Sequence, residues 1–177
     1  VGTKLGKPMS IAQAVLVMID SGQGLDYAHK REVDGKPLNI IHRDISPHNI
    51  MVSYNGEVKI MDFGISKTLS SEKLTQTGIV LGKPMYMAPE QFEGHVTDAC
   101  DQYALGIILY EMLVGDIPFD GDTPIAQYRA RFKEQVQFPT ERAGQFPQGL
   151  MDAVLRATQR EPDDRFPTVR ELLATVE

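Results

Sequence analysis

The stretch from Thr97 to Val114 is apolar on almost every side, and it constrains the fold more than any other part of the sequence. A helix at a protein surface has one polar face, so a helix that is apolar all round belongs in the centre of a domain. Gly115 follows and is suited to end this helix, because glycine readily adopts the left-handed conformation. We therefore expect one domain built around a central helix, and 177 residues suffice to bury a core.

Helical patterns also dominate the rest of the sequence. Ser10 with Gln13, and Thr168 with Glu171, form capping-box patterns, in which paired side chains satisfy the free backbone N–H groups of a helix start. Apolar residues then recur at spacings of three and four, as on the buried side of a helix. The predicted helices beside the central one cover residues 11–29, 124–133, 147–159 and the residues after Thr168.

One β-hairpin is predicted around Asn55-Gly56. These two residues tolerate positive φ and favour a tight turn, and they lie between the short β-like runs NIMVS and VKIMD. The expected fold class is therefore α+β, predominantly α-helical, with a small β-hairpin. Two polar segments, 31–39 and 66–85, are predicted to be a connector and a long loop.

Composition excludes several classes of protein. The net charge of −6 argues against a nucleic-acid partner or an anionic membrane surface. The single cysteine, Cys100, rules out an intrachain disulfide, favours a reducing cytoplasmic location and is interpreted as a small buried hydrophobe. The longest apolar run contains Glu111 and is too short for a membrane segment, which needs about 20 residues.

Asp44, Asn49 and Asp62 are the candidate chemical groups. The predicted hairpin starts just after Asn49 and ends just before Asp62, so antiparallel pairing brings these two residues side by side. Asp44 lies on the loop that enters the first strand. Two carboxylates and an amide suit Mg²⁺ with phosphate oxygens, and a carboxylate can also orient an attacking hydroxyl. The set indicates phosphoryl transfer.

Five motifs occur in order: HRDISPHN at 42–49, DFG at 62–64, APE at 88–90, the central helix with its exit, and DDRFPT at 163–168. Together they resemble the catalytic domain of protein kinases. The DGKPL insert, the SPHN ending and YMAPEQ are similar to eukaryotic-type serine/threonine kinases of bacteria, particularly of the myxobacterial kind. The resemblance covers nearly the whole of residues 1–177, and all of it falls on the larger, C-terminal lobe of that domain.

The resemblance implies a role for each matching residue at the reaction centre. Asp44 is the catalytic base or orients the substrate hydroxyl, and Asn49 and Asp62 hold Mg²⁺. Met51 forms the surface below the adenine of ATP. A protein substrate supplies the hydroxyl that accepts the phosphate.

Other residues support this centre by resemblance. His42 and Phe63 belong to a packed spine that fixes the DFG segment, and Asp101 anchors the backbone of the catalytic loop. Glu90 pairs with Arg165. Asp98 is interpreted as a cap of the central helix. His29, His48 and His95 lack a second ligand at metal spacing and are interpreted as structural or surface residues.

Regulation is expected in the long loop. Arg43 directly precedes the catalytic aspartate, which in this family goes with activation by phosphorylation of the loop. A phosphate on Thr75 or Thr77 would then bind Arg43, with Lys67 as a further partner, through charge-assisted hydrogen bonds. The alternative is that both threonines are ordinary polar loop residues.

The sequence lacks the motifs of the smaller kinase lobe. It contains no G-x-G-x-x-G-x-V loop and no V-A-I-K-like lysine strand. We therefore expect a piece of a longer active protein that by itself binds ATP weakly and transfers phosphate negligibly. The cleft surface near Met51 and Phe63 is expected to be apolar and exposed, and it could support self-association.

Two positions depart from the family pattern. Ser46 stands where most such kinases have lysine, and Lys83 follows Gly82 where threonine is common. We expect the hydroxyl and the ammonium group to have changed places, so that Lys83 reaches Asp44 and the transferring phosphate while Ser46 supplies the hydroxyl. The alternative is a solvated lysine and an unrelated serine.

Two other functions remain open. A pseudokinase would use the fold as a binding or scaffolding module, but Asp44, Asn49 and Asp62 are intact. A small-molecule phosphotransferase shares the Asp-x-x-x-x-Asn spacing, but the APE motif and Arg165 favour a protein substrate. Tyrosine specificity is disfavoured, because tyrosine kinases usually carry an arginine-bearing loop in place of SPHN.

Overall fold

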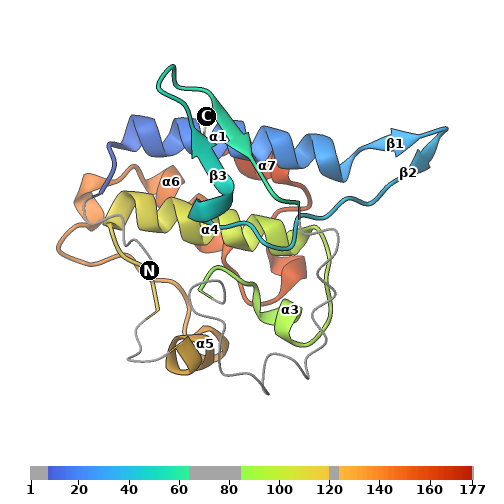
Figure 1. The fold of residues 1–177 in the computed structure, drawn as a ribbon. Coiled ribbons are helices and arrows are strands. Elements are labelled where there is room, and N and C mark those ends of the chain that lie inside the picture. Colours follow the sequence, from blue (N-terminus) through green and yellow to red (C-terminus); the bar gives the residue numbers. More distant parts are fainter. Residues whose placement is uncertain (1–7, 64–84, 120–123, 177) are drawn as a thin grey trace.

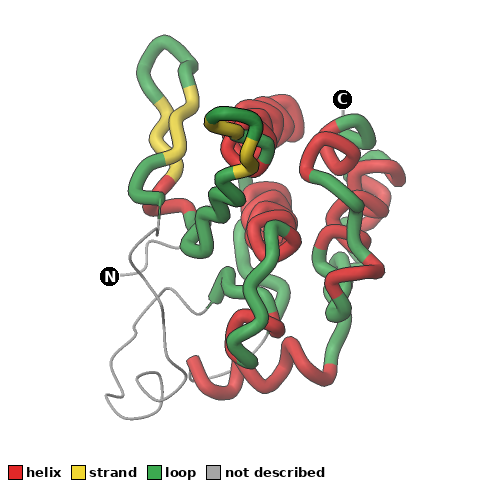
Figure 2. The backbone as a smooth tube through the Cα atoms, turned by 90° about the vertical axis from the view of Figure 1, so that its right-hand side faces the viewer, coloured by secondary structure: helices red, strands yellow, loops and turns green. Residues whose placement is uncertain are grey.

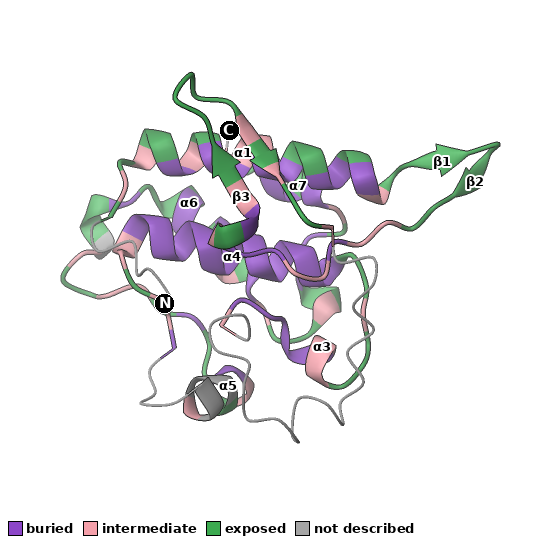
Figure 3. Ribbon diagram, viewed as in Figure 1, coloured by how far each residue is buried: buried purple, intermediate pink, exposed green. Residues whose placement is uncertain are grey.

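Helix α4 (Ala99–Val114) runs through the middle of the molecule, and Figure 3 shows it buried along nearly its whole length. Every residue from Ala99 to Leu113 is buried. Gly115 ends the helix with a φ of 88°, and its N–H donates to the Glu111 carbonyl at 2.7 Å. The predicted central helix and its glycine stop are thus confirmed. Asp98 takes the N-cap position, but its side chain makes no capping hydrogen bond, so the predicted side-chain cap is wrong.

The computed structural model describes residues 8–63, 85–119 and 124–176. Within these ranges the chain is mainly helical, and its strands form two small antiparallel hairpins at the edge of the helical body (Figures 1 and 2). The other helices are α1 (Ile11–His29), α3 (Pro89–Phe92), α5 (Pro124–Lys133), α6 (Gln148–Ala157) and α7 (Val169–Leu173), with short 3₁₀ helices η1 (Pro47–Asn49), η2 (Ala143–Gln145) and η3 (Pro162–Asp164).

Helices α1, α6 and α7 pack around α4, and the sequence explains how closely they approach. Gly22 of α1 faces α7, where an added Cβ would lie 2.5 Å from Leu173 Cδ2. Gly106 of α4 faces the end of α6, where an added Cβ would lie 2.7 Å from Thr158 Cγ2. A larger side chain at either crossing would require these neighbouring side chains to shift, at a cost of about 1–3 kcal/mol for an overpacked core.

The predicted capping box at Ser10 and Gln13 is present with both bonds, whereas the one predicted at Thr168 and Glu171 is present only as the N-cap bond. Ser10 Oγ accepts a hydrogen bond from the Gln13 N–H at 3.3 Å, and Gln13 Oε1 accepts from the Ser10 N–H at 3.3 Å. At the start of α7, Thr168 Oγ1 accepts from the Glu171 N–H at 3.2 Å. Each cap satisfies an N–H group that has no partner inside its helix, which stabilises a helix by about 1 kcal/mol.

The predicted hairpin is strands β3 (Ile50–Val52) and β4 (Val58–Ile60), which pair with Ile50 opposite Ile60. The turn lies where Asn55-Gly56 predicts it, but only Gly56 has a positive φ, of 85°, and the Ser53 N–H donates to the Glu57 carbonyl at 2.8 Å across a three-residue loop. The pairing continues beyond the strands, since the Met61 N–H donates to the Asn49 carbonyl at 2.8 Å. This bond places Asn49 next to the residue that precedes Asp62.

A second hairpin replaces the irregular connector expected over residues 31–39. Strands β1 (Glu32–Val33) and β2 (Lys36–Pro37) pair through a turn at Asp34 and Gly35, with φ values of 51° and 71°. Two consecutive residues at positive φ match the twist of a tight hairpin, and Asp-Gly favours that turn. The expectation of a connector without strands was therefore wrong, because the turn chemistry outweighs the polar composition. The loop predicted over 66–85 lies outside the described residues except for Met85.

Candidate active site

The loop between β2 and β3 is held by one buried carboxylate. Asp101 lies in the first turn of α4, and its Oδ2 and Oδ1 accept from the backbone N–H groups of His42 and Arg43, each at 2.9 Å. His29, at the end of α1, donates from Nε2 to Asp101 Oδ2 at 2.8 Å. The central helix therefore fixes this loop directly, at the position where the sequence predicts such an anchor.

The contact of His29 with Asp101 is a feature of the site that the sequence alone did not reveal. The His29 imidazole is buried against Asp101, so of the two interpretations given above, structural and surface, the structural one applies. Its position at the end of α1, 72 residues before Asp101, gives no local pattern that would indicate the contact.

The loop brings Asp44 and Asn49 together. Asn49 is buried and donates from Nδ2 to the Asp44 carbonyl at 2.7 Å, which leaves its Oδ1 as the atom available to a metal. The hydrogen bond between Met61 and Asn49 puts Asp62 at the adjacent strand exit, with a φ of 56°. The backbone thus brings Asn49 next to Asp44 and next to the residue that precedes Asp62, while the convergence of the three side chains stays a prediction.

This donor set fits a magnesium ion that carries its own phosphate ligands. Among the described residues no three His, Cys, Asp or Glu side chains cluster as a metal cage. Mg²⁺ is usually bound by one or two carboxylates together with phosphate oxygens and water, rather than by an all-protein cage. The exposed Asp62 carboxylate and the Asn49 amide oxygen can supply that partial shell.

His42 connects the loop to the DFG segment. It is fully buried, and its ring lies 4.6 Å from the Phe63 ring, centroid to centroid. Its Nε2 donates to the Met61 carbonyl at 3.0 Å, and its Nδ1 accepts from the Asp44 N–H at 3.3 Å. One nitrogen must donate and the other accept, so the imidazole is neutral with its proton on Nε2. The contact predicted between His42 and Phe63 is present.

The segment from Met85 to α3 forms a second layer beside the loop. Arg165 and Glu90 form a buried two-bond pair at 2.6 and 2.8 Å, as expected from the sequence. Tyr86 donates from its hydroxyl to Glu111 Oε2 at 2.7 Å, and burial followed by this carboxylate raises the pKa of the phenol far above its usual value. Arg131 of α5 donates to the Met87 carbonyl at 3.2 Å. Sequence reasoning did not find Tyr86 or Arg131.

Burial shifts the pKa of three side chains packed on or beside α4. Burial raises the pKa of Tyr103 to about 12 and, with the neighbouring Asp101 and Glu90 charges, raises that of the Cys100 thiol. A thiol of this kind is a poor nucleophile, so Cys100 acts as the small buried hydrophobe that the sequence indicated. Burial also lowers the pKa of the Arg131 guanidinium.

The roles predicted for several other site residues are not tested by the described structure. Lys67, Thr75, Thr77 and Lys83 lie outside the described residues. Met51 is on β3 with 53% of its surface exposed. Ser46 is buried at the start of η1, and its Oγ has no hydrogen-bond partner among the residues that the structure describes.

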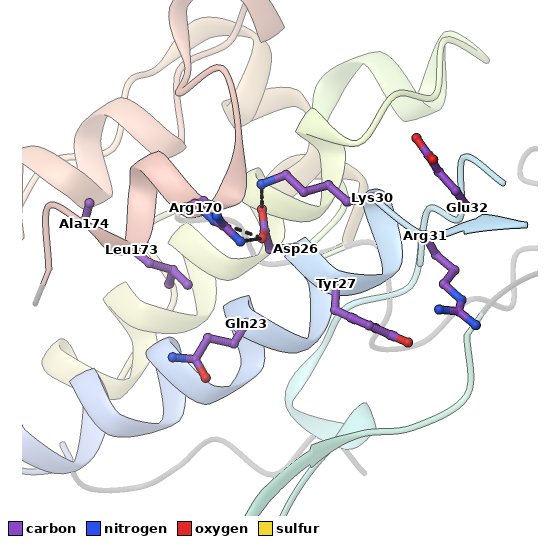
Figure 4. Close-up of a pocket in the computed structure, with 9 residues that line it drawn as sticks. All are labelled: Gln23, Asp26, Tyr27, Lys30, Arg31, Glu32, Arg170, Leu173 and Ala174. Atoms are coloured by element: carbon purple, nitrogen blue, oxygen red, sulfur yellow. Dashed lines mark hydrogen bonds and ion pairs between the residues drawn. The ribbon is translucent and has the colours of Figure 1, made fainter. Parts of the chain in front are cut away.

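A cavity of about 660 Å³ lies elsewhere, between the end of α1 and α7 (Figure 4). Asp26 binds Lys30 at 2.6 Å and Arg170 at 2.9 Å there. Burial opposes ionisation of Asp26, but these two hydrogen bonds outweigh it and hold the carboxyl pKa below its usual value. None of the residues predicted for catalysis lines this cavity, so we interpret its charged groups as a tie between the two helices.

Comparisons with known proteins agree with this geometry. The protein kinase domain family matches residues 4–176. Tyrosine-protein kinase MasK of Myxococcus xanthus is 41% identical over 163 residues, which are 91% of this chain and 25% of that protein. The probable serine/threonine-protein kinase PknB of Lactococcus lactis is 38% identical over 170 residues, 96% of this chain and 26% of that protein.

A third relative has similar coverage. Serine/threonine-protein kinase PknB of Mycolicibacterium smegmatis is 38% identical over 170 residues, 94% of this chain and 26% of that protein. The chain thus spans about a quarter of the length of these curated relatives. In the described ranges no helix is both long and apolar enough to cross a membrane. The ordered motifs, the clamped loop and these matches show that the chain belongs to the protein kinase domain family, and within it to the eukaryotic-type kinases of bacteria.

Proposed function

We propose that the protein transfers the γ-phosphate of ATP to a serine or threonine hydroxyl of a protein substrate. The observation that carries this proposal is the bond from Asn49 Nδ2 to the Asp44 carbonyl, beside the exit of β4 that leads to Asp62. This bond supports a site in which the Asp44 carboxylate lies close to two proposed metal ligands, Asn49 and Asp62. Because ATP is a cytoplasmic nucleotide, we propose a cytoplasmic location for this reaction.

In this proposal each residue has a defined task. Asp44 orients the attacking hydroxyl and accepts its proton, and the clamped backbone holds the carboxylate in one place. Asn49 Oδ1 and the Asp62 carboxylate hold Mg²⁺, which neutralises charge on the phosphates when bound. His42 keeps the DFG segment against the loop through its contacts with Phe63 and the Met61 carbonyl.

We further propose that residues 1–177 form the larger lobe of a two-lobed kinase domain. Met51, Val52 and Met61 are about half exposed on and beside the β3–β4 hairpin, which supports a surface that another part of the protein covers. Met51 would then lie below the adenine. By itself the 177-residue chain should bind ATP weakly and transfer phosphate at a negligible rate, because only one wall of the cleft is present.

Ser46 and Lys83 are proposed to share the task of the usual loop lysine. The buried Ser46 hydroxyl, two residues after Asp44, is consistent with a polar partner supplied from outside the described residues. Replacing Lys83 with alanine in the full-length kinase should lower kcat by orders of magnitude while leaving ATP affinity nearly unchanged. Unchanged kcat would exclude the exchange.

Arg43 is proposed to receive a phosphate from Thr75 or Thr77. Arg43 precedes Asp44, so a phosphate bound to its guanidinium would order the residues around the acidic group.

The hydroxyl class is the point on which the relatives differ. Two of them are named serine/threonine kinases, whereas MasK is named a tyrosine kinase. The SPHN sequence after Asp44 lacks the arginine that tyrosine kinases usually place there, and it favours serine or threonine here. Phosphoamino-acid analysis of the product separates the two acceptor classes directly.

The decisive experiment compares the full-length wild-type kinase with its Asp44→Asn variant. Labelled γ-phosphate should pass from ATP to a generic basic protein with the wild type, and the variant should be slower by at least about 100-fold, the lower range for loss of a general base. Magnesium removal should abolish transfer. A wild type that binds ATP without transferring phosphate would instead identify a pseudokinase.

A further inference from the structure

Gln91 joins the APE segment to the catalytic loop. It lies in α3, directly after Glu90, and its side-chain amide contacts two backbone groups. Its Oε1 accepts from the Ala88 N–H at 2.9 Å, and its Nε2 donates to the Arg43 carbonyl at 3.0 Å. If the amide were turned by 180°, its oxygen would face the Arg43 carbonyl oxygen and its NH₂ group would face the Ala88 N–H. The two backbone neighbours therefore determine which side-chain atom is the oxygen and which is the nitrogen.

Arg43 is a strained residue, and this strain gives the contact its importance. It has a φ of 67°, a left-handed conformation that non-glycine residues adopt only when their surroundings impose it. Its N–H donates to Asp101 Oδ1 at 2.9 Å, and its carbonyl accepts from Gln91. Both backbone polar groups are thus held by side chains far away in the sequence, one in α4 and one in α3.

The carbonyl that Gln91 holds belongs to the peptide plane that joins Arg43 to Asp44. Any rotation of this plane would move the backbone nitrogen and Cα of Asp44 and, with them, its carboxylate. The other backbone groups of Asp44 are bound as well, its N–H to His42 and its carbonyl to Asn49. Gln91 therefore completes a set of hydrogen bonds that fixes the orientation of Asp44 from both sides.

Little space is available for water to replace this amide. The cavity between the loop and the Tyr86–Gln91 segment measures about 10 Å³, which is at most the space for one water molecule. The segment itself is fixed by Tyr86 on Glu111 and by Glu90 on Arg165. A displacement of α3 would therefore be transmitted to the Arg43–Asp44 peptide through one direct, partly buried hydrogen bond.

We propose that Gln91 is a positioning residue that couples the APE segment to the proposed catalytic base Asp44. The inference rests on the proposed kinase function, because its consequence is expressed in phosphate transfer. It predicts that turnover depends on the hydrogen-bond donor of this side chain, even though Gln91 contacts neither ATP nor substrate in the proposed reaction.

The kinetic test uses Gln91→Glu, Gln91→Met and, as a matched control on the same segment, Glu93→Gln in the full-length kinase. Gln91→Glu keeps the acceptor for Ala88 but loses the donor to Arg43 at neutral pH. We expect kcat to fall about 10- to 100-fold, the size of effect that a small misplacement of a reacting group produces, with little change in KM for ATP. The exposed Glu93→Gln change should leave both constants unaltered.

The pH profile distinguishes positioning from a general structural defect. When the introduced carboxyl of Gln91→Glu is protonated, it regains an O–H donor for the Arg43 carbonyl. Its kcat relative to wild type should therefore rise as the pH falls from about 8 to about 5.5, since partial burial raises a carboxyl pKa above its usual value near 4.3. Gln91→Met has no donor at any pH, so its ratio to wild type should stay constant.

Hydrogen–deuterium exchange of the same proteins provides a readout that does not need activity. Peptides that cover residues 40–46 should exchange about fivefold faster in Gln91→Met than in wild type, as expected for loss of one typical hydrogen bond, and Glu93→Gln should match wild type. Equal exchange and equal kcat in wild type and both Gln91 variants would overturn the inference. If the wild type itself transfers no phosphate, the proposed function fails, while the exchange comparison still decides whether Gln91 holds the loop.

Discussion

Two arginine–carboxylate pairs tie separate parts of this molecule together, and they differ in how much water reaches the arginine. Arg165 and Glu90 have side chains that are 0% and 8% exposed. In the pair between Arg170 and Asp26 the arginine side chain is 73% exposed and the carboxylate 9%. The first pair fixes α3 next to the loop that carries Asp44, whereas the second joins α1 to α7 beside the cavity of Figure 4.

The two arginine–carboxylate pairs have similar hydrogen bonds, but we expect them to contribute differently to the free energy of unfolding. Arg165 also donates to the carbonyls of Ala99, Gln159 and Arg160, so its guanidinium is almost fully satisfied without water. Removing one member would leave charge and carbonyl groups stranded in the protein interior. In the second pair only Arg170 is largely in water, so its guanidinium stays solvated if Asp26 is replaced, and the net stabilisation by pairs with a solvated member is small.

The substitution with the largest expected effect on stability is Arg165→Met. It should lower the free energy of unfolding by about 3–5 kcal/mol, because Glu90 is left buried without its partner. Urea titration at pH 7 measures this loss. If the stranded carboxylate is the cause, the double variant Arg165→Met, Glu90→Leu should recover part of it. A double variant less stable than Arg165→Met would assign the loss to the arginine–carbonyl bonds instead.

At the second pair the change is Asp26→Asn, which removes the carboxylate and leaves the exposed arginine, and its expected effect is much smaller. The free energy of unfolding at pH 7 should fall by about 1 kcal/mol or less, since Lys30 and Arg170 regain water. The same urea titration measures both variants. A loss as large as that of Arg165→Met would show that exposure of the arginine does not govern the strength of these pairs.

The contribution of Asp26 to stability should also depend on pH. The folded-state pKa of Asp26 is lowered from an ordinary value of 3.8, so its ion pairs stabilise the protein above that pH and lose their effect as the pH falls through the lower folded-state value. The difference in unfolding free energy between wild type and Asp26→Asn should therefore be constant from pH 7 to about 4.5 and shrink below pH 3.8. A constant difference down to pH 3 would contradict the role of this ionisation.

Local patterns predicted the parts of the fold that local chemistry determines. The all-apolar run of α4, the glycine after it and the Asn55-Gly56 turn each specify their structure within a few residues. The β1–β2 hairpin was missed because its polar composition was weighed above its Asp34-Gly35 turn, although the turn was readable from the sequence.

The contacts around the candidate site depend on long-range placement instead. Asp101, Glu90 and Arg165 could be assigned because the family resemblance gave their partners. His29 and Gln91 could not, since they meet Asp101 and Arg43 across 72 and 48 residues, and no spacing rule connects such positions. Only the packing of α1 and α3 against the loop reveals them.

The β1–β2 hairpin offers a practical use that follows from its position. It projects from the end of α1, and among the described atoms a Cβ at Gly35 would meet nothing within 4 Å (Figure 1). Pro37 provides no backbone donor on the outer edge of β2, which discourages addition of a further strand. The Asp34-Gly35 turn is therefore a suitable point to insert an epitope tag or a fluorophore without disturbing the hydrogen bonds that hold the Asp44 loop.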